Sequence, residues 1–159
     1  MSYAQSKPAS NFRPSGYQTG RGSADEYLDS MVRSASPARL RLIVLERAVE
    51  TATTLSATWR EDTSRKGPNE WSLKLLDLIS ELLSGITSDE GVCGKVADLY
   101  VFLSKHLIIA ERTGDADAID EIRLVLEVEA ETWRMVCANE LGASDSRQPI
   151  TSGGLNLEG

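Results

Sequence analysis

Few side chains in this 159-residue sequence could support catalysis or hold a metal. The chain has one histidine, His106, and two cysteines, Cys93 and Cys137, and none stands in a Cys-x-x-Cys, His-x-x-His or Glu-x-x-His pattern. Zinc sites and the di-iron sites of helical bundles need such clusters. No glycine-rich loop follows a strand pattern, which disfavours a phosphate-binding site. The sequence therefore predicts no enzymatic activity, no metal and no cofactor.

Acidic residues gather toward the C-terminal end. Residues 115–141 contain eight Asp and Glu against two arginines, Arg123 and Arg134. Four of these carboxylates fall within 115–121, but without the spacing of an EF-hand loop. Two interpretations stay open: a solvated helix face that aids solubility, and a surface that steers a basic segment of a partner.

Overall composition excludes several classes. The chain carries 17 Lys and Arg against 24 Asp and Glu, a formal charge of −7, which disfavours nucleic-acid binding by phosphate neutralisation. No apolar run approaches the roughly 20 residues that span a bilayer, and the N-terminus lacks the apolar core of a secretory signal. We therefore expect a cytoplasmic chain without membrane insertion, its cysteines reduced.

The ends of the chain differ from its middle. Residues 1–26 are rich in Ser, Gly, Pro and Gln and show no apolar period, and residues 142–159 contain four glycines. Such segments bury too little apolar surface to offset the entropy of ordering them. We expect a flexible N-terminal arm at 1–26, a folded domain at 27–141 and a flexible C-terminal tail at 142–159.

Within the domain, apolar residues recur at helical spacing and no alternating strand pattern is found. Four helices are predicted, at about 37–59, 70–86, 88–113 and 116–141. Ser36 with Pro37, Asn69, a capping box of Thr87 and Glu90, and Asp115 or Asp117 mark their starts, and Gly114 ends the third. The core face of the first helix is predicted to hold Leu40, Val44, Ala48, Leu55 and Trp59. Long helices with mostly short loops predict an all-α fold, an antiparallel up-and-down four-helix bundle with disordered N- and C-terminal tails.

Three predicted helices carry more apolar residues than one core-facing stripe requires. The additional residues, on faces away from the main stripe, are Ala97, Val101 and Ile108 in the third helix, Leu124, Val128 and Met135 in the fourth, and Leu42, Leu45 and Val49 in the first. Either a helix is central and buried on all sides, or the tails cover the surplus, or the surplus forms a groove for apolar segments of a partner. For the third and fourth helices together we favour the groove.

The start of the domain resembles a known family. The matching residues are, in order, Tyr27, Val32, Ser34, Ala35, Ser36, Pro37 and Leu40, then Ser72 and Leu73, Leu99 and Tyr100, Ala110, and a helix running from Asp115 to Trp133. This ordered set, over about residues 27–137, resembles the flagellar export chaperone family (FliS), with Ser34 at a threonine position. The chain departs from the family at Val44-Leu45-Glu46-Arg47, where Leu-Tyr-Asp-Gly is common.

The resemblance implies a small helical bundle in the bacterial cytoplasm. It implies binding of the disordered C-terminal segment of flagellin, which prevents premature polymerisation and aids export during flagellum assembly. It also implies an N-terminal segment that can occupy part of the binding surface, and contact with the export gate is a further expectation. The candidate contact or gating residues are Tyr27, Ala97, Val101, Ile108, Leu124, Val128 and Met135. The alternative is a structural or adaptor bundle that self-associates, or binds another helical partner, through the same stripes.

Overall fold

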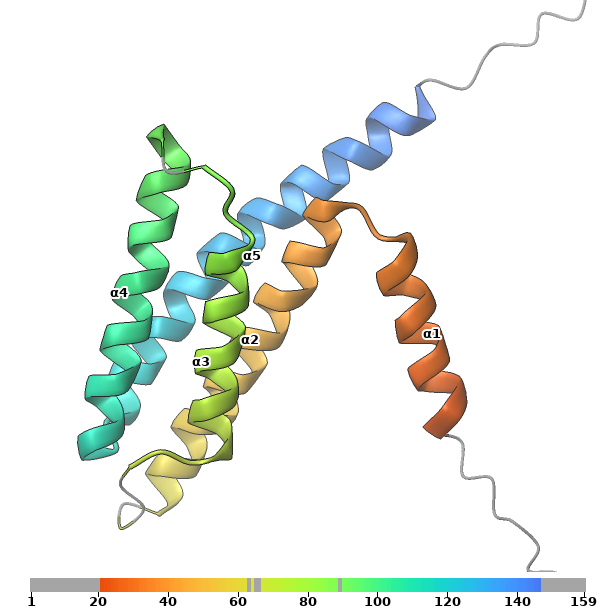
Figure 1. The fold of residues 1–159 in the computed structure, drawn as a ribbon. Helices are drawn as coiled ribbons and strands as arrows, with labels where there is room; N and C mark the ends of the chain where they lie inside the picture. Colours follow the sequence, from red (N-terminus) through yellow and green to blue (C-terminus); the bar gives the residue numbers. More distant parts are fainter. Residues whose placement is uncertain (1–20, 63, 65–66, 89, 147–159) are drawn as a thin grey trace, which may run out of the picture. The chain divides into compact units, whose positions relative to one another are not determined.

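The computed structural model describes residues 21–62, 64, 67–88 and 90–146. These residues form five helices and no strand (Figure 1): α1 (Arg21–Ser34), α2 (Pro37–Glu61), α3 (Glu70–Ser84), α4 (Gly91–Thr113) and α5 (Ala116–Asp145). The predicted all-α class is confirmed, but the described residues contain five helices rather than four. Residues 1–20 and 147–159, the outer parts of the predicted arm and tail, lie outside the described residues. Helix α1 belongs to one compact unit and helices α2 to α5 to another.

Helix α1 was not predicted from the sequence. Its apolar residues Tyr27, Leu28 and Val32 are exposed within the described structure. An ion pair of 2.6 Å between Asp29 and Arg33, one helical turn apart, supports the helix. The helix ends at Ser34. Ser36 precedes Pro37, and the residue before a proline disfavours the helical backbone, so α1 does not continue into α2. Most of the fourteen residues of α1 are polar, which is why the sequence did not identify this helix.

The predicted helix starts at Ser36, Asn69 and Asp115 are confirmed by hydrogen bonds. Ser36 Oγ accepts from the Arg39 N–H at 3.2 Å, and Pro37 occupies the first helical position. Asn69 Oδ1 accepts two N–H groups at 2.9 Å at the start of α3, and Asp115 Oδ1 accepts two at 3.1 Å at the start of α5. These caps fix where each helix enters the core.

The turn before α4 differs from the prediction. Glu90 itself is the N-cap residue, without a side-chain hydrogen bond of the capping kind, so the expected box between Thr87 and Glu90 does not form. Gly91 has a φ of +60°, a left-handed backbone that prevents the helix from extending back toward Thr87. At the other end, Gly114 adopts φ +66° and ends α4 as predicted.

Helices α2, α3, α4 and α5 run alternately in opposite directions (Figure 1). Helix α2 packs on both α3 and α5, and α4 packs on α3 and α5. The shared core includes Trp59, Leu75, Ile79, Leu103, Ile122 and Leu126, each at most 1% exposed. No helix among the described residues is long and apolar enough to cross a membrane.

Helix α2 shows which surplus residues are core. Leu42 and Leu45 are 1% and 0% exposed, and Val49 packs against the core, whereas the predicted core residues Leu40 and Val44 are only partly buried. The reason is that α2 has a neighbour on each side, so a wider arc of its surface is covered. The surplus residues of this helix are therefore core, although α2 is not buried on all sides, since Arg47 and Glu50 are exposed.

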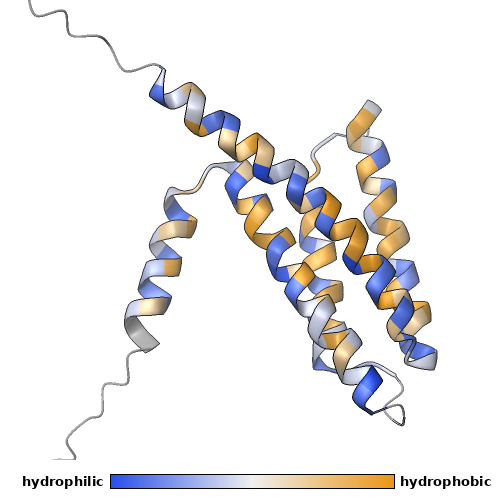
Figure 2. Cartoon of the chain, turned by 180° about the vertical axis from the view of Figure 1, so that it is seen from behind, coloured by the Kyte–Doolittle hydropathy of each residue, from blue (hydrophilic) through white to orange (hydrophobic). Residues whose placement is uncertain are grey.

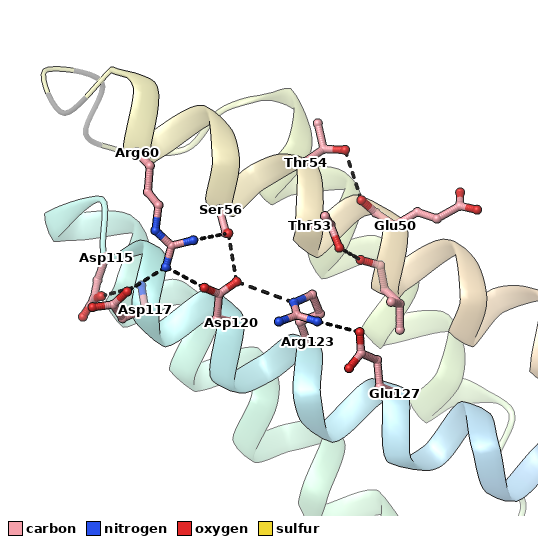
Figure 3. A network of polar contacts seen from close by, with 11 residues as sticks. Glu50, Thr53, Thr54, Ser56, Arg60, Asp115, Asp117, Asp120, Arg123 and Glu127 are labelled. Atoms are coloured by element: carbon pink, nitrogen blue, oxygen red, sulfur yellow. Dashed lines mark hydrogen bonds and ion pairs between the residues drawn. The ribbon is translucent and has the colours of Figure 1, made fainter.

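A network of charged side chains joins the end of α2 to the start of α5 (Figure 3). Arg60 of α2 donates to Asp117 at 2.7 Å and to Asp120 at 2.5 Å, and Ser56 donates to Asp120 at 2.9 Å. The hydrogen bond from Arg60 lowers the pKa of the Asp120 carboxyl below its ordinary value, with a further contribution from Ser56. Arg123 extends the network along α5 to Glu127 at 2.6 Å. Part of the acidic surface predicted on this helix is therefore paired with arginines.

Candidate partner-binding surface

The stripe residues predicted on α4 and α5 lie at the surface of the structure. Leu124, Val128 and Met135 of α5 are 54%, 70% and 56% exposed. On α4, Val101 and Ile108 are exposed and Ala97 is partly buried. None of the six belongs to the buried core, in contrast to Leu42 and Leu45 of α2. Figure 2 shows apolar residues recurring along both α4 and α5.

Leu124, Val128 and Met135 form one line along α5, here called the α5 stripe. Their spacing of four and seven residues keeps them on one helix face. That face points away from the buried residues of the same helix, which include Ile122, Leu126 and Ala130. The α5 stripe is therefore an outward-facing apolar surface on a helix whose opposite side is fixed in the core.

Helix α4 has a charged ridge on the side opposite its buried residues. The ridge consists of Asp98, Lys105 and Arg112, which repeat every seven residues and are all exposed. Apolar residues, all exposed except the partly buried Ala97, lie on both sides of it. Ala97, Val101 and Ile108 form one flank, and Phe102 and Ile109, which are 58% and 64% exposed, form the other.

A contact between His106 and Glu121 identifies the flank of α4 that faces α5. His106 Nε2 lies 3.0 Å from a Glu121 carboxylate oxygen, and the His106 ring stacks on Phe102 with 5.6 Å between ring centres. Phe102, His106 and Ile109 are spaced as i, i+4 and i+7, so they share one side of α4. We call Phe102 and Ile109 the α5-side flank.

The same contact connects this flank to the α5 stripe. Glu121, Leu124 and Val128 follow one another on α5 as i, i+3 and i+7, so the contact with His106 lies beside the stripe. The resulting surface contains Phe102, Ile109, Leu124, Val128 and Met135, with the His106–Glu121 pair between its two halves. An aromatic ring and four aliphatic chains suit an apolar helix or extended segment.

Ala97, Val101 and Ile108 lie on the other flank of α4. Since the α5-side flank faces α5 and α4 otherwise packs on α3, this second flank faces α3. The structure therefore does not bring the two predicted stripes together. Phe102 and Ile109 were missed because the period of one helix shows which residues point outward but not on which side its neighbour packs.

Tyr27, the remaining predicted residue, lies on α1 in the other compact unit. Its side chain is 69% exposed. The described structure thus makes Tyr27 available for contact, and its role as a gating residue stays a prediction.

The candidate catalytic and metal-binding side chains do not assemble into a site. Cys93 is exposed, Cys137 is buried, and both are free thiols. Among the residues that the structure describes, no group of three or more His, Cys, Asp or Glu side chains could hold a metal ion. His106 is engaged by Glu121 and Phe102, which is the flanking role that its position on an apolar face predicts.

Comparison with known proteins gives the family. The family described as Flagellar protein FliS matches residues 20–140, a span that contains almost all of the five described helices. No curated protein and no solved structure matches the chain. The match extends beyond the resemblance found at 27–137 and covers more than half of the sequence. The chain therefore belongs to the FliS family and is a non-enzymatic flagellin export chaperone of the bacterial cytoplasm.

Proposed function

We propose that the C-terminal segment of flagellin binds along the α5 stripe and the α5-side flank of α4. The observation that carries this proposal is the exposure of five large apolar side chains on the outer faces of α4 and α5, two helices that meet at the His106–Glu121 contact. Exposed apolar patches of this kind commonly mark binding sites. Helices α2 to α5 serve in this proposal as a four-helix bundle that holds the surface.

The mechanism is exchange of one apolar partner for another. A flagellin segment that would bury its apolar face against other flagellin molecules buries it on the chaperone instead, which prevents premature polymerisation. Phe102 supplies the largest apolar side chain of the surface and is the expected anchor, because aromatic residues dominate binding energy at interfaces. A disordered segment loses conformational entropy when it binds, and a large buried surface is needed to offset that loss. We therefore expect a long contact rather than a compact one.

The remaining predicted contacts keep a place in this proposal. A long bound segment can continue from the α5-side flank to Ala97, Val101 and Ile108 on the other side of the α4 ridge. Tyr27 of α1 is proposed to contact the bound flagellin segment, and the export gate is proposed to receive the complex. A pull-down with the cytoplasmic part of the export gate tests the contact with the gate. We expect the gate to retain the chaperone with a bound flagellin segment more than the chaperone alone.

Calorimetric titration of the full-length chain with the C-terminal segment of flagellin from the same organism tests the proposal. We expect 1:1 binding with a negative heat-capacity change, the signature of apolar burial. Val128→Glu should weaken binding by about 2–4 kcal/mol, because it places a charge in an apolar interface. Val128→Thr, which is similar in shape and uncharged, is the matched control and should lose much less.

Two outcomes would contradict the proposal. Val128 is 70% exposed, so Val128→Glu should leave the helical circular dichroism and the melting temperature nearly unchanged. Unfolding of this variant would show that the α5 stripe is core. A tight homo-oligomer in light scattering, combined with no binding of the flagellin segment, would favour the adaptor alternative.

A further inference from the structure

A cavity of about 530 Å³ opens between the start of α2, the end of α3 and the C-terminal half of α5. Its lining includes Arg41, Glu81, Gly85, Trp133, Val136 and Glu140. Leu40 and Val44, the residues of α2 that were predicted to be core and are only partly buried, also line it. The site at the α5 stripe does not use this cavity.

The floor of the cavity is held rigidly. The Arg41 guanidinium lies 5.3 Å from the ring centre of Tyr100 and 5.2 Å from that of Trp133. It also donates to the Tyr100 hydroxyl at 2.9 Å and to the Leu82 carbonyl at 3.3 Å. These four contacts fix the arginine and the indole wall before any ligand binds, and a preformed site loses less entropy on binding.

The rim of the cavity is acidic. Glu81 and Glu140 are both exposed, and neither forms an ion pair among the described residues. The Glu140 carboxylate accepts a hydrogen bond from the neutral Ser36 hydroxyl at 2.8 Å. The lining cation, Arg41, is directed toward Tyr100 and the end of α3. The cavity has apolar walls, and its lining carries two carboxylates against one arginine that is held by its own contacts. This balance favours a ligand that is apolar with a positive charge beside it, and disfavours an acidic one.

The cavity also adjoins the end of the α5 stripe. Val136, in its wall, directly follows Met135, the last residue of the stripe. From Val128 to Val136 the helix rises about 12 Å, so a bound helix of about two turns spans the distance. A segment lying along the stripe that bends around α5 after Met135 can therefore reach the cavity.

We propose that this cavity is a second subsite for flagellin, which takes an apolar side chain of the bound segment together with a Lys or Arg about one helical turn away. This inference rests on the proposed function, because it assigns the occupant to the same bound segment. The apolar side chain fills the space beside Trp133 and Val136, and the basic side chain pairs with Glu81 and Glu140 at the rim.

Gly85 makes the test possible. Its φ of −74° is one that any residue adopts, and an added Cβ would meet Arg41 Nη1 at an ordinary 3.5 Å. Gly85→Leu therefore places a side chain at the cavity wall without straining the backbone, and Gly85→Ala is the matched control that leaves most of the cavity open. The double variant Glu81→Gln and Glu140→Gln removes the charge of the rim while keeping its shape.

Each variant of the full-length chain is titrated with a synthetic flagellin C-terminal peptide at low and high salt. Gly85→Leu should weaken binding about tenfold or more, and Gly85→Ala less than about threefold. The double glutamine variant should weaken binding several-fold at low salt and reduce its salt dependence. Matching urea unfolding curves confirm that every variant keeps the native fold.

The outcomes separate this inference from the proposed function. If wild type and Gly85→Leu bind equally well while Val128→Glu does not bind, the second subsite is wrong and the proposed function stands. If Gly85→Leu weakens binding and the double glutamine variant does not, the basic residue is wrong. If Gly85→Leu binds the peptide more tightly than wild type, a segment of the chain itself fills the cavity and the proposed subsite is wrong. If Gly85→Leu changes the molar mass of the protein in solution and leaves peptide binding unchanged, a second copy fills the cavity and the proposed subsite is again wrong. No binding by wild type overturns both proposals.

Discussion

Arg41 of α2 donates a 2.9 Å hydrogen bond to the hydroxyl of Tyr100 on α4, a residue that is fully buried. Tyr100 in turn donates to the carboxylate of Glu129 on α5, and Arg41 also donates to the Leu82 carbonyl on α3. One polar chain thus links all four helices α2 to α5 in the half of the molecule where the cavity lies. Buried polar networks of this kind favour one arrangement of helices, and here the Arg41 Nε atom is the one nitrogen of that guanidinium left without a partner in the described structure.

Arg41→Ala should lower the free energy of unfolding by about 2–3 kcal/mol, because it leaves Tyr100 and the Leu82 carbonyl without a donor and removes the stacking on two rings. Urea denaturation at pH 7 measures the loss. Arg39→Ala is the control, because Arg39 is an exposed residue of the same helix, two positions away. Equal stability of the two variants would contradict a structural role for the network.

Alkaline pH should destabilise the chain through Tyr100. Burial, followed by the hydrogen bond to Glu129, raises the pKa of the Tyr100 phenol well above its ordinary value of 10.0. Below pH 10 the phenol is protonated in both states and its contribution is complete. Above pH 10 the unfolded chain loses the proton first, so stability falls by up to about 1.4 kcal/mol per pH unit. Urea midpoints measured from pH 9 to 11 should fall more steeply for wild type than for Tyr100→Phe.

Acidic pH should release the network of Figure 3 through Asp120. Because the hydrogen bond from Arg60 lowers the pKa of Asp120, this carboxylate contributes stability above its ordinary pKa of 3.8 and loses it as the pH falls below that value. Wild type should therefore be more stable than Asp120→Asn at pH 6, and the difference should shrink by pH 3. A difference that stays constant with pH would show that the Asp120 charge contributes nothing.

The two flanks of α4 should differ in their effect on flagellin binding. Phe102→Ala should weaken binding by about 1.5–3 kcal/mol, since it removes the expected aromatic anchor beside the α5 stripe. Ile108→Ala, on the flank that faces α3, should cost less than about 1 kcal/mol, because we expect the main contact on the α5 side. Calorimetric titration of both variants with the flagellin segment measures the two losses of binding free energy. Equal losses would mean that the bound segment covers both sides of the ridge.

Local signals in the sequence were enough to predict most helix boundaries. Ser36, Asn69, Gly114 and Asp115 act within a few residues of themselves, through side-chain hydrogen bonds or a left-handed backbone, so their effect does not depend on distant contacts. The box expected at Thr87 failed because the left-handed Gly91 starts the helix later. A capping pattern alone does not reveal such a competing turn.

Features set by neighbouring helices could not be predicted in the same way. Leu42 and Leu45 are core because α2 has neighbours on two sides, and Phe102 belongs to the candidate surface because His106 meets Glu121. Both facts depend on contacts between residues far apart in the chain. The cavity likewise needs parts of three helices, with Gly85, Val136 and Pro37 contributed from separate segments.

The ridge of Asp98, Lys105 and Arg112 has a consequence for the chaperone itself. A protein that exposes apolar residues for a partner also offers them to other copies of itself, and aggregation is the usual cost. Charges recurring at every second turn of α4 divide its apolar surface into two narrow strips, and a face-to-face contact between two copies would have to strip water from these charges. A single slender segment can lie along one strip and avoid them. Three exposed charges on α4 therefore disfavour a broad contact between two copies more than they disfavour contact with one narrow segment.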